Sequence, residues 1–130
     1  MIRKQAITQI EDLEWHSVEE IPGLRYKFLI DSDVTSSRGL SLGALEVAPG
    51  AILPPHHHSP QEIYLFHSGE GEVILGDEIH QVRAGTAVFI PEHCWHGLIN
   101  KGDQPLAFYW IFPTDSWSEI EYIYDKSSAK

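Results

Sequence analysis

Short stretches of alternating apolar and polar residues run through this chain. Such alternation has the period of two that a β-strand produces, because successive side chains point to opposite faces. Residues 24–30 show it clearly, with Leu24, Tyr26, Phe28 and Ile30 on one predicted face. Glycine and proline separate the stretches, as turns between short strands require. The pattern predicts further strands at residues 40–47, 62–67, 72–75, 79–82, 86–90 and 105–112.

The two ends of the chain carry weaker patterns. Residues 2–10 favour a short strand or extended lead-in, and the acidic residues 11–20 favour one or two helical turns before Pro22 and Gly23. Residues 118–124 suit a last strand or a short helix, and residues 126–130 are expected to fray. The prediction is therefore an all-β single domain over residues 1–130, with its core at about residues 22–124.

Composition supports this fold class and narrows the function. A chain of 130 residues with four Trp, five Tyr and five Phe can bury one core, as a barrel of short strands does. Its net charge of −10 argues against nucleic acid and anionic membrane surfaces as partners. No apolar run suggests a signal peptide or a membrane span, and the single Cys94 excludes an internal disulfide. We therefore expect a cytoplasmic protein that acts on a small-molecule substrate.

Two histidine-containing stretches carry the candidate chemistry. In the first, alternation places His56 and His58 on one face, and Glu62 follows after a short turn. The second stretch contributes His96. Three imidazoles and one carboxylate suit one divalent transition metal, Fe, Mn, Co, Ni or Zn, and disfavour calcium and magnesium, which prefer oxygen ligands.

Tyr64 shares the predicted face of Glu62, two residues further along the same strand. Beside a divalent cation its phenol would have a lowered pKa and could remove a proton from a bound substrate. A core tyrosine with a hydrogen-bonded hydroxyl explains the pattern equally well. The pattern assigns no role to His57, His67 or His93.

The spacing of these stretches resembles the two signatures of the cupin superfamily. The first runs from Gly50 through the two histidines and Glu62 to Gly69, and the second from Gly85 through Pro91 and His96 to Asn100. The resemblance implies a double-stranded β-helix, a jelly-roll barrel, with a metal held by His56, His58, Glu62 and His96. His93 stands where the second signature usually has a glycine in a tight turn, and histidine tolerates positive φ better than bulky residues do.

Over about residues 22–122 the chain also resembles the small single-domain cupin dimethylsulfoniopropionate lyases of marine bacteria. That resemblance implies that Tyr64 is the catalytic base of a β-elimination and that Tyr122 is a second active-site tyrosine. Tyr122 and Trp110 are candidates to bind the sulfonium group through their aromatic faces. His57 and His67 depart from the pattern of these relatives. The resemblance rests on residues 22–31, 39–43, 58–64, 108–115 and 118–122.

Two other functions are compatible with the same residues. Another cupin metalloenzyme, such as a non-haem iron dioxygenase or an isomerase of a small carboxylate or carbonyl compound, would use the same four ligands. A non-catalytic barrel that binds a small molecule is a further alternative. The sequence leaves the native metal and a homodimer through edge strands undecided.

Overall fold

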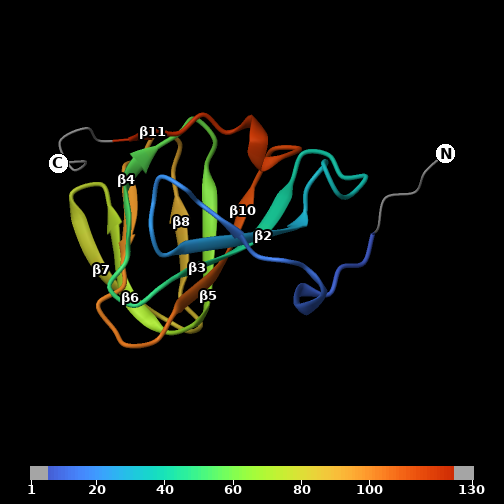
Figure 1. The fold of residues 1–130 in the computed structure, drawn as a ribbon. Coiled ribbons are helices and arrows are strands. Elements are labelled where there is room, and N and C mark those ends of the chain that lie inside the picture. Colours follow the sequence, from blue (N-terminus) through green and yellow to red (C-terminus); the bar gives the residue numbers. More distant parts are fainter. Residues whose placement is uncertain (1–5, 125–130) are drawn as a thin grey trace.

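Two antiparallel β-sheets pack face to face around one core (Figure 1). The computed structural model describes residues 6–124. One sheet has the order β1-β2-β3-β10-β5-β8, and the other has the order β11-β4-β9-β6-β7. The strands of the first sheet are β1 (His16–Ser17), β2 (Leu24–Ile30), β3 (Ser41–Val47), β5 (Glu62–Ser68), β8 (Ala87–Ile90) and β10 (Leu106–Phe112). Those of the second are β4 (Ile52–His57), β6 (Glu70–Leu75), β7 (Glu78–Arg83), β9 (His96–Ile99) and β11 (Ile123–Tyr124).

The predicted alternation explains which side chains form the core. In β5 the buried residues are Glu62, Tyr64 and Phe66, whereas Ile63 and Leu65 between them are exposed. In β10 every residue is apolar, so the sequence alone assigns no inward face. The structure places Phe108, Trp110 and Phe112 inside, each at most 4% exposed. The all-β prediction and the two-sheet barrel are thus confirmed.

The N-terminal segment differs from the prediction. In place of the helical turns expected over residues 11–20, the structure has the short 3₁₀ helix η1 (Ile10–Asp12), after which the chain is extended and forms β1. The ring of Trp15 lies under the charged ends of Arg25 and Lys27, at 4.2 and 4.5 Å. These contacts tether the segment to β2, so tertiary packing overrides a weak helical preference. No strand forms at residues 6–9, and residues 2–5 of the predicted lead-in lie outside the described range.

The C-terminal segment contains both of the elements that the sequence left as alternatives. The 3₁₀ helix η2 (Trp117–Glu119) begins at Ser116, whose hydroxyl accepts from the Ser118 N–H at 3.1 Å. Strand β11 then pairs with β4, with Tyr124 opposite His56. This pairing carries the C-terminal segment across one end of the barrel, beside the histidines. The predicted frayed residues 126–130 lie outside the described range.

Two turns have backbone geometry that bears on the signatures. His93 adopts a φ of 61°, the left-handed conformation of the glycine usually found there. Gly69 has a φ of 84°, and β6 begins directly after it, two residues earlier than predicted. Within residues 6–124, no helix has the length and apolar character that a membrane span requires.

Candidate functional site

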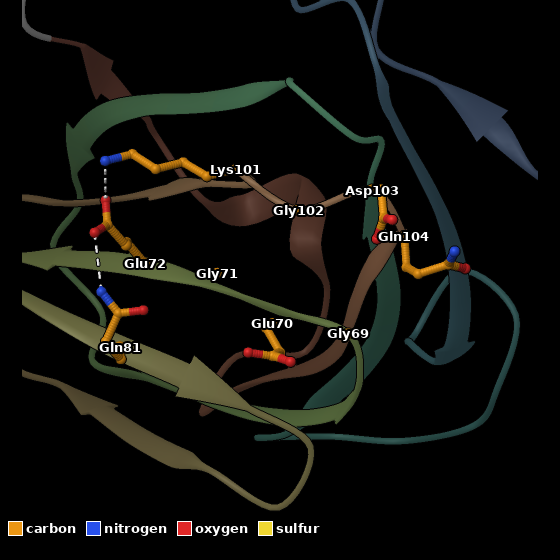
Figure 2. A pocket seen from close by; sticks show the side chains of 9 residues that line it. All are labelled: Gly69, Glu70, Gly71, Glu72, Gln81, Lys101, Gly102, Asp103 and Gln104. Carbon is orange, nitrogen blue, oxygen red and sulfur yellow. Dashed lines mark hydrogen bonds and ion pairs between the residues drawn. The ribbon is translucent and has the colours of Figure 1, made fainter.

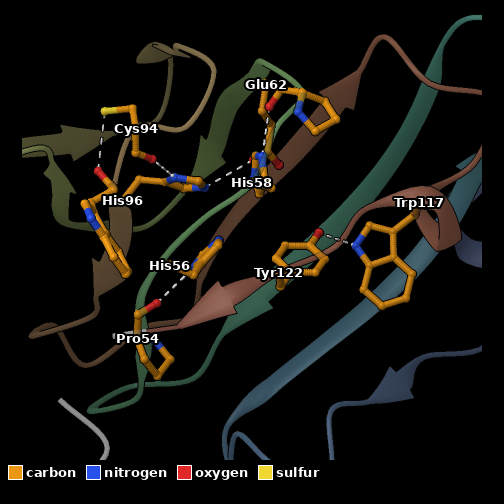
Figure 3. Close-up of polar contacts among 10 residues, drawn as sticks. Pro54, His56, His58, Glu62, Cys94, His96, Trp117 and Tyr122 are labelled. Carbon is orange, nitrogen blue, oxygen red and sulfur yellow. Dashed lines mark hydrogen bonds and ion pairs between the residues drawn. The ribbon is translucent and has the colours of Figure 1, made fainter. Parts of the chain in front are cut away.

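Three histidines form a buried cluster at one end of the barrel (Figure 3). His56 lies in β4, His58 follows that strand, and His96 begins β9. The pairing of β4 with β9 places His56 directly opposite His96. One ligand atom from each ring lies within 4.8 Å of the others, and none of the three residues is more than 2% exposed. These rings could hold a metal ion.

Backbone carbonyls fix the tautomer of each ring. The Nδ1 atoms of His56, His58 and His96 each lie 2.8 Å from a carbonyl oxygen, of Pro54, Pro60 and Cys94 respectively. A carbonyl only accepts hydrogen bonds, so each Nδ1 carries the proton and donates it. Each Nε2 of a neutral ring is then left with a free lone pair, which is the state that binds a metal.

Glu62 completes the cluster from the opposite sheet. Its Oε1 atom lies 3.1 Å from Nε2 of His58 and 3.3 Å from Nε2 of His96. A carboxylate and a bare imidazole nitrogen are both acceptors, so this arrangement calls for a cation or an additional proton between them. His96 Nε2 is buried and has no hydrogen-bond partner. The donor set therefore fits a divalent transition metal.

Burial also keeps His56 neutral. Removal from water, with a smaller effect from the neighbouring His96, lowers the pKa of His56 from 6.5 to about 3. Because metal ligation needs the unprotonated ring, His56 is ready to bind a cation over the whole neutral range.

A cavity of about 200 Å³ opens beside the cluster. Its lining contains no Lys or Arg among the described residues, and its one exposed charged side chain is Glu20. Aromatic rings with no competing positive charge suit a positively charged ligand. The aromatic residues of the lining are Tyr26, Tyr64, Phe108, Trp110, Trp117, Tyr122 and Tyr124.

Tyr64 and Tyr122 both line this cavity near the histidines. The ring of Tyr64 lies 5.9 Å from that of His96, and Tyr64 is 2% exposed. The ring of Tyr122 lies 5.4 Å from those of His56 and His58. Burial, and then the charge of Glu62, raises the pKa of both phenols well above 10. The lowered pKa expected for Tyr64 depends on a bound cation and stays a prediction.

The indole of Trp117 orients Tyr122. Its Nε1–H donates to the phenol oxygen of Tyr122, as Figure 3 shows. This hydrogen bond opposes the rise in the Tyr122 pKa. Sequence reasoning missed Trp117, since nothing in its local pattern separates it from a packing residue. Its backbone N–H donates to Asp31 at 2.9 Å, a contact between segments far apart in the sequence.

Trp110 forms the inner wall of the cavity. The edges of Tyr26 and Phe28 meet its ring at 6.4 and 6.2 Å. Its indole Nε1 is buried without a hydrogen-bond partner. Directly across the sheet stands Gly43, whose lack of a side chain leaves room for the ring. The sequence pattern places Tyr26 only in a strand, although the face that it shares with Leu24 and Phe28 could have suggested a place in the site.

The remaining histidines lie outside the cavity lining. His57 points away from its neighbours, as alternation predicts, and packs its ring 4.5 Å from that of Trp95. His93 lies 6.2 Å from His57. His67 stacks on Tyr109 at 4.5 Å on the outer face of the first sheet. None of these contacts brings them to the buried cluster.

A second, polar pocket lies at the other end of the barrel, around the turn at Gly69 (Figure 2). Its volume is about 330 Å³. Glu72 accepts from Lys101 at 3.0 Å and from Gln81 at 2.9 Å, and these contacts lower the pKa of its carboxyl group. The described lining of this pocket contains no histidine or tyrosine, so the pocket offers no chemistry comparable to that of the histidine cluster.

Comparison with known proteins agrees with this architecture. The family profile described as the cupin domain matches residues 43–112. Over 105 residues the chain is 36% identical to the dimethylsulfoniopropionate lyase DddW of Ruegeria pomeroyi, covering 81% of this chain and 68% of that protein. It is 30% identical over 83 residues to the glucose-6-phosphate isomerase of Thermococcus litoralis, covering 58% of this chain but only 44% of the isomerase.

Solved structures show the same fold at lower identity. The polyketide cyclase RemF from Streptomyces resistomycificus superposes with a TM-score of 0.80 at 22% identity, covering 92% of this chain and 84% of that one. This likeness extends to the fold alone. With the matched profile and the relationship to DddW, it shows that the chain belongs to the cupin family.

Proposed function

We propose that this protein is a metal-dependent lyase that cleaves dimethylsulfoniopropionate into dimethyl sulfide and acrylate. The observation that carries the proposal is a cavity lined by two chemically different sets of side chains. One set is the cluster of the three histidines and Glu62, of which His56 and Glu62 reach the lining, and the other is a group of aromatic rings with no Lys or Arg among the described lining residues. The substrate has a matching pair of ends, a carboxylate and a sulfonium cation. The relationship to DddW supports the same assignment.

The carboxylate end of the substrate belongs at the histidine cluster. A divalent metal held by His56, His58, Glu62 and His96 would polarise the carboxylate and make the adjacent C–H more acidic. The protein contributes a dry surrounding, because all four of these residues are at most 4% exposed. Low solvent exposure strengthens electrostatic interactions in the site.

Proton removal is assigned to Tyr64. Its phenolate oxygen takes the proton from the carbon next to the carboxylate, and the resulting electron pair forms the new C=C bond. The C–S bond breaks at the same time, and its electrons leave with sulfur as neutral dimethyl sulfide. Acrylate keeps the carboxylate, and the proton stays on Tyr64 until solvent removes it. The position of Tyr64 in the cavity wall, beside His96, supports this role.

The sulfonium end belongs against the aromatic wall. Tyr122 and Trp110 offer aromatic rings to a cation, an interaction worth about 2 kcal/mol in a desolvated site. The hydrogen bond from Trp117 holds Tyr122 in place, so little rotational freedom is lost on binding.

Other cupin chemistry fits the cavity less well. A sugar phosphate such as the substrate of the related isomerases carries a doubly charged group that Lys or Arg normally binds. The described lining residues include neither. A dioxygenase would consume oxygen, whereas elimination consumes none, so oxygen uptake during turnover separates these two functions.

The direct test measures headspace dimethyl sulfide from protein loaded separately with Fe(II), Mn(II), Co(II), Ni(II) or Zn(II). We expect release with at least one metal and its loss, by at least about 100-fold, in Tyr64→Phe with metal content unchanged. Tyr109→Phe is the matched control, because Tyr109 lies on the outer face of the same sheet and should keep full activity. No release with any of the metals, or full activity in Tyr64→Phe, would refute the proposal.

A further inference from the structure

Asp31 is a buried carboxylate to which the proposed mechanism gives no role. It follows directly after β2 and is 1% exposed. It neither lines the cavity nor belongs to the four candidate metal ligands. Within residues 6–124, Asp31 forms no ion pair with a Lys, Arg or His side chain. A buried charge lowers stability unless other groups compensate for it, so this carboxylate depends on the hydrogen bonds that it accepts.

The two oxygens of Asp31 accept hydrogen bonds from two different segments. Oδ1 accepts from the backbone N–H of Asp33 at 3.1 Å, within the loop that follows β2. Oδ2 accepts from the backbone N–H of Trp117 at 2.9 Å, 86 residues further along the chain. Hydrogen bonds to an ionised carboxylate are about twice as strong as bonds between neutral groups. Asp31 therefore joins the loop after β2 to the first residue of η2.

Neighbouring contacts join the same two segments. The N–H of Ser32 donates to the carbonyl oxygen of Asp115 at 2.8 Å, and the N–H of Gly39 donates to Oδ1 of Asp115 at 2.7 Å. The bond from Trp117 to Asp31 is the one of these three that reaches η2 itself. The position of this helix relative to β2 therefore depends most directly on the Asp31 carboxylate.

The placement of η2 matters for the site because of Trp117. Its indole lines the cavity and donates to the phenol oxygen of Tyr122 (Figure 3). The ring of Tyr122 lies 5.4 Å from the rings of His56 and His58. Two hydrogen bonds of one residue, Trp117, thus connect Asp31 to the ring that lies beside the histidine cluster. A displacement of η2 would carry the indole with it and would release the hydroxyl of Tyr122.

We propose that Asp31 is a positioning residue, which holds the Tyr122 ring in place through Trp117. Its role in turnover rests on the proposed function, whereas the contacts themselves do not. An amide has a single acceptor oxygen, so Asp31→Asn keeps the shape of the side chain but deprives either Trp117 or Asp33 of its acceptor. Small displacements of groups that position a substrate lower reaction rates severely. Loss of this carboxylate should therefore impair substrate binding in protein that is still folded.

The first measurement does not depend on catalysis. It follows hydrogen exchange of the Trp indole N–H groups by ¹⁵N NMR in the full chain loaded with diamagnetic Zn(II), with Trp117→Phe to assign the Trp117 signal. We expect Asp31→Asn to accelerate exchange of the Trp117 indole at least about tenfold, because its bond to Tyr122 opens more often. Exchange of the Trp15 indole, whose ring packs on Arg25, should be unchanged.

Asp33→Asn is the matched control. Asp33 lies in the same loop and is exposed. Its Oδ2 accepts from the Ser116 hydroxyl at 3.3 Å, a bond that an amide oxygen can also accept. This variant should keep the exchange rates and the kinetics of the wild type. Circular dichroism and metal analysis show whether each variant folds and keeps its metal.

The second measurement is the rate of dimethyl sulfide release against substrate concentration. Asp31→Asn should raise KM about five- to tenfold, because a displaced Tyr122 ring no longer contacts the sulfonium group. A smaller folded fraction would instead lower kcat and leave KM unchanged. Asp31→Asn combined with Trp117→Phe should raise KM little more than Trp117→Phe alone, since both changes break the same connection.

Folded Asp31→Asn with the indole exchange rate or the KM of the wild type would overturn the proposal, as would additive effects in the double variant. A wild type that releases no dimethyl sulfide with any metal would refute the proposed function, and indole exchange alone would then decide whether Asp31 holds Trp117.

If Asp31→Asn does not fold, hydrogen exchange of the wild type decides. The backbone and indole N–H groups of Trp117 should have protection factors within about tenfold of each other, because one opening of η2 exposes both. A difference of more than about a hundredfold would contradict the proposal.

Discussion

Gly43→Ala tests how tightly the cavity wall is packed. Gly43 stands opposite Trp110 in the pairing of β3 with β10. A Cβ atom at this position would lie 2.0 Å from Cζ2 and 2.3 Å from Cη2 of the Trp110 ring. Ordinary carbon contacts are about 3.5–4.0 Å. The indole must therefore move by more than about 1 Å to accommodate a single methyl group.

The expected cost follows from the surroundings of the ring. Forcing an extra methyl group into a packed core costs about 1–3 kcal/mol. Replacing glycine by alanine also reduces the entropy of the unfolded chain, which returns about 0.4–1 kcal/mol. The net loss should be about 1–2 kcal/mol. Tyr26 and Phe28 pack against the ring, so its displacement should also disturb the cavity and lower kcat/KM by about tenfold or more.

Urea unfolding measures the loss of stability, and dimethyl sulfide release measures the loss of activity. Gly102→Ala is the matched control, since the nearest atom to its added Cβ would be 3.4 Å away and its backbone is not in the left-handed region. That variant should behave like the wild type. If Gly43→Ala unfolds at the same urea concentration as the wild type and keeps its activity, the packing argument is wrong.

Three further predictions concern the site and its mouth. In metal-free protein, the free energy of unfolding should fall by a few kcal/mol as pH drops from 6.5 toward 3. In this range His56 binds a proton in the unfolded chain but not in the folded protein. Urea unfolding at several pH values should show this dependence of stability on pH, and His56→Gln should make the dependence weaker. Trp117→Phe should lower the free energy of unfolding by about 0.5–1.5 kcal/mol, because it removes the hydrogen-bond donor to Tyr122. Urea unfolding measures this loss, and Trp95→Phe, at a 37% exposed position, is the control. Equal losses of stability in the two variants would contradict the assigned hydrogen bond. Glu20→Gln should raise KM for the cationic substrate about two- to fivefold with kcat unchanged, and added salt should reduce the difference. If Glu20→Gln has the KM of the wild type at low salt, Glu20 does not attract the substrate.

Three candidate ligands of the histidine cluster could be predicted from local spacing, whereas His96 joins them through the pairing of β9 with β4. Two residues apart on one strand, His56 and His58 share a face, and the turn that follows brings Glu62 within reach. Alternation also placed Tyr64 correctly on the inner face of β5. These predictions depend only on the period of a strand and the length of a turn, which neighbouring residues determine.

The aromatic part of the cavity could not be predicted in the same way. Both faces of β10 are apolar, so periodicity gave no inward side for Trp110, and burial chose it only when the sheets packed. Tyr122 reaches the histidines because β11 pairs with β4, about 65 residues away in the chain. The prediction of helical turns over residues 11–20 was wrong for a related reason, since contacts of Trp15 with β2 outweighed a weak local preference for a helix.

The sequence by itself determined most of the strands and the all-β class, because these depend on short-range spacing, and the resemblance to the cupin signatures joined His96 to the three other candidate metal ligands. Only the tertiary structure decided which faces turn inward, how Glu62 meets His58 and His96 across two sheets, and which aromatic rings complete the cavity. The physical reason is that these features come from burial and pairing between distant segments, and the free energy of those contacts is not encoded in any single stretch of the chain.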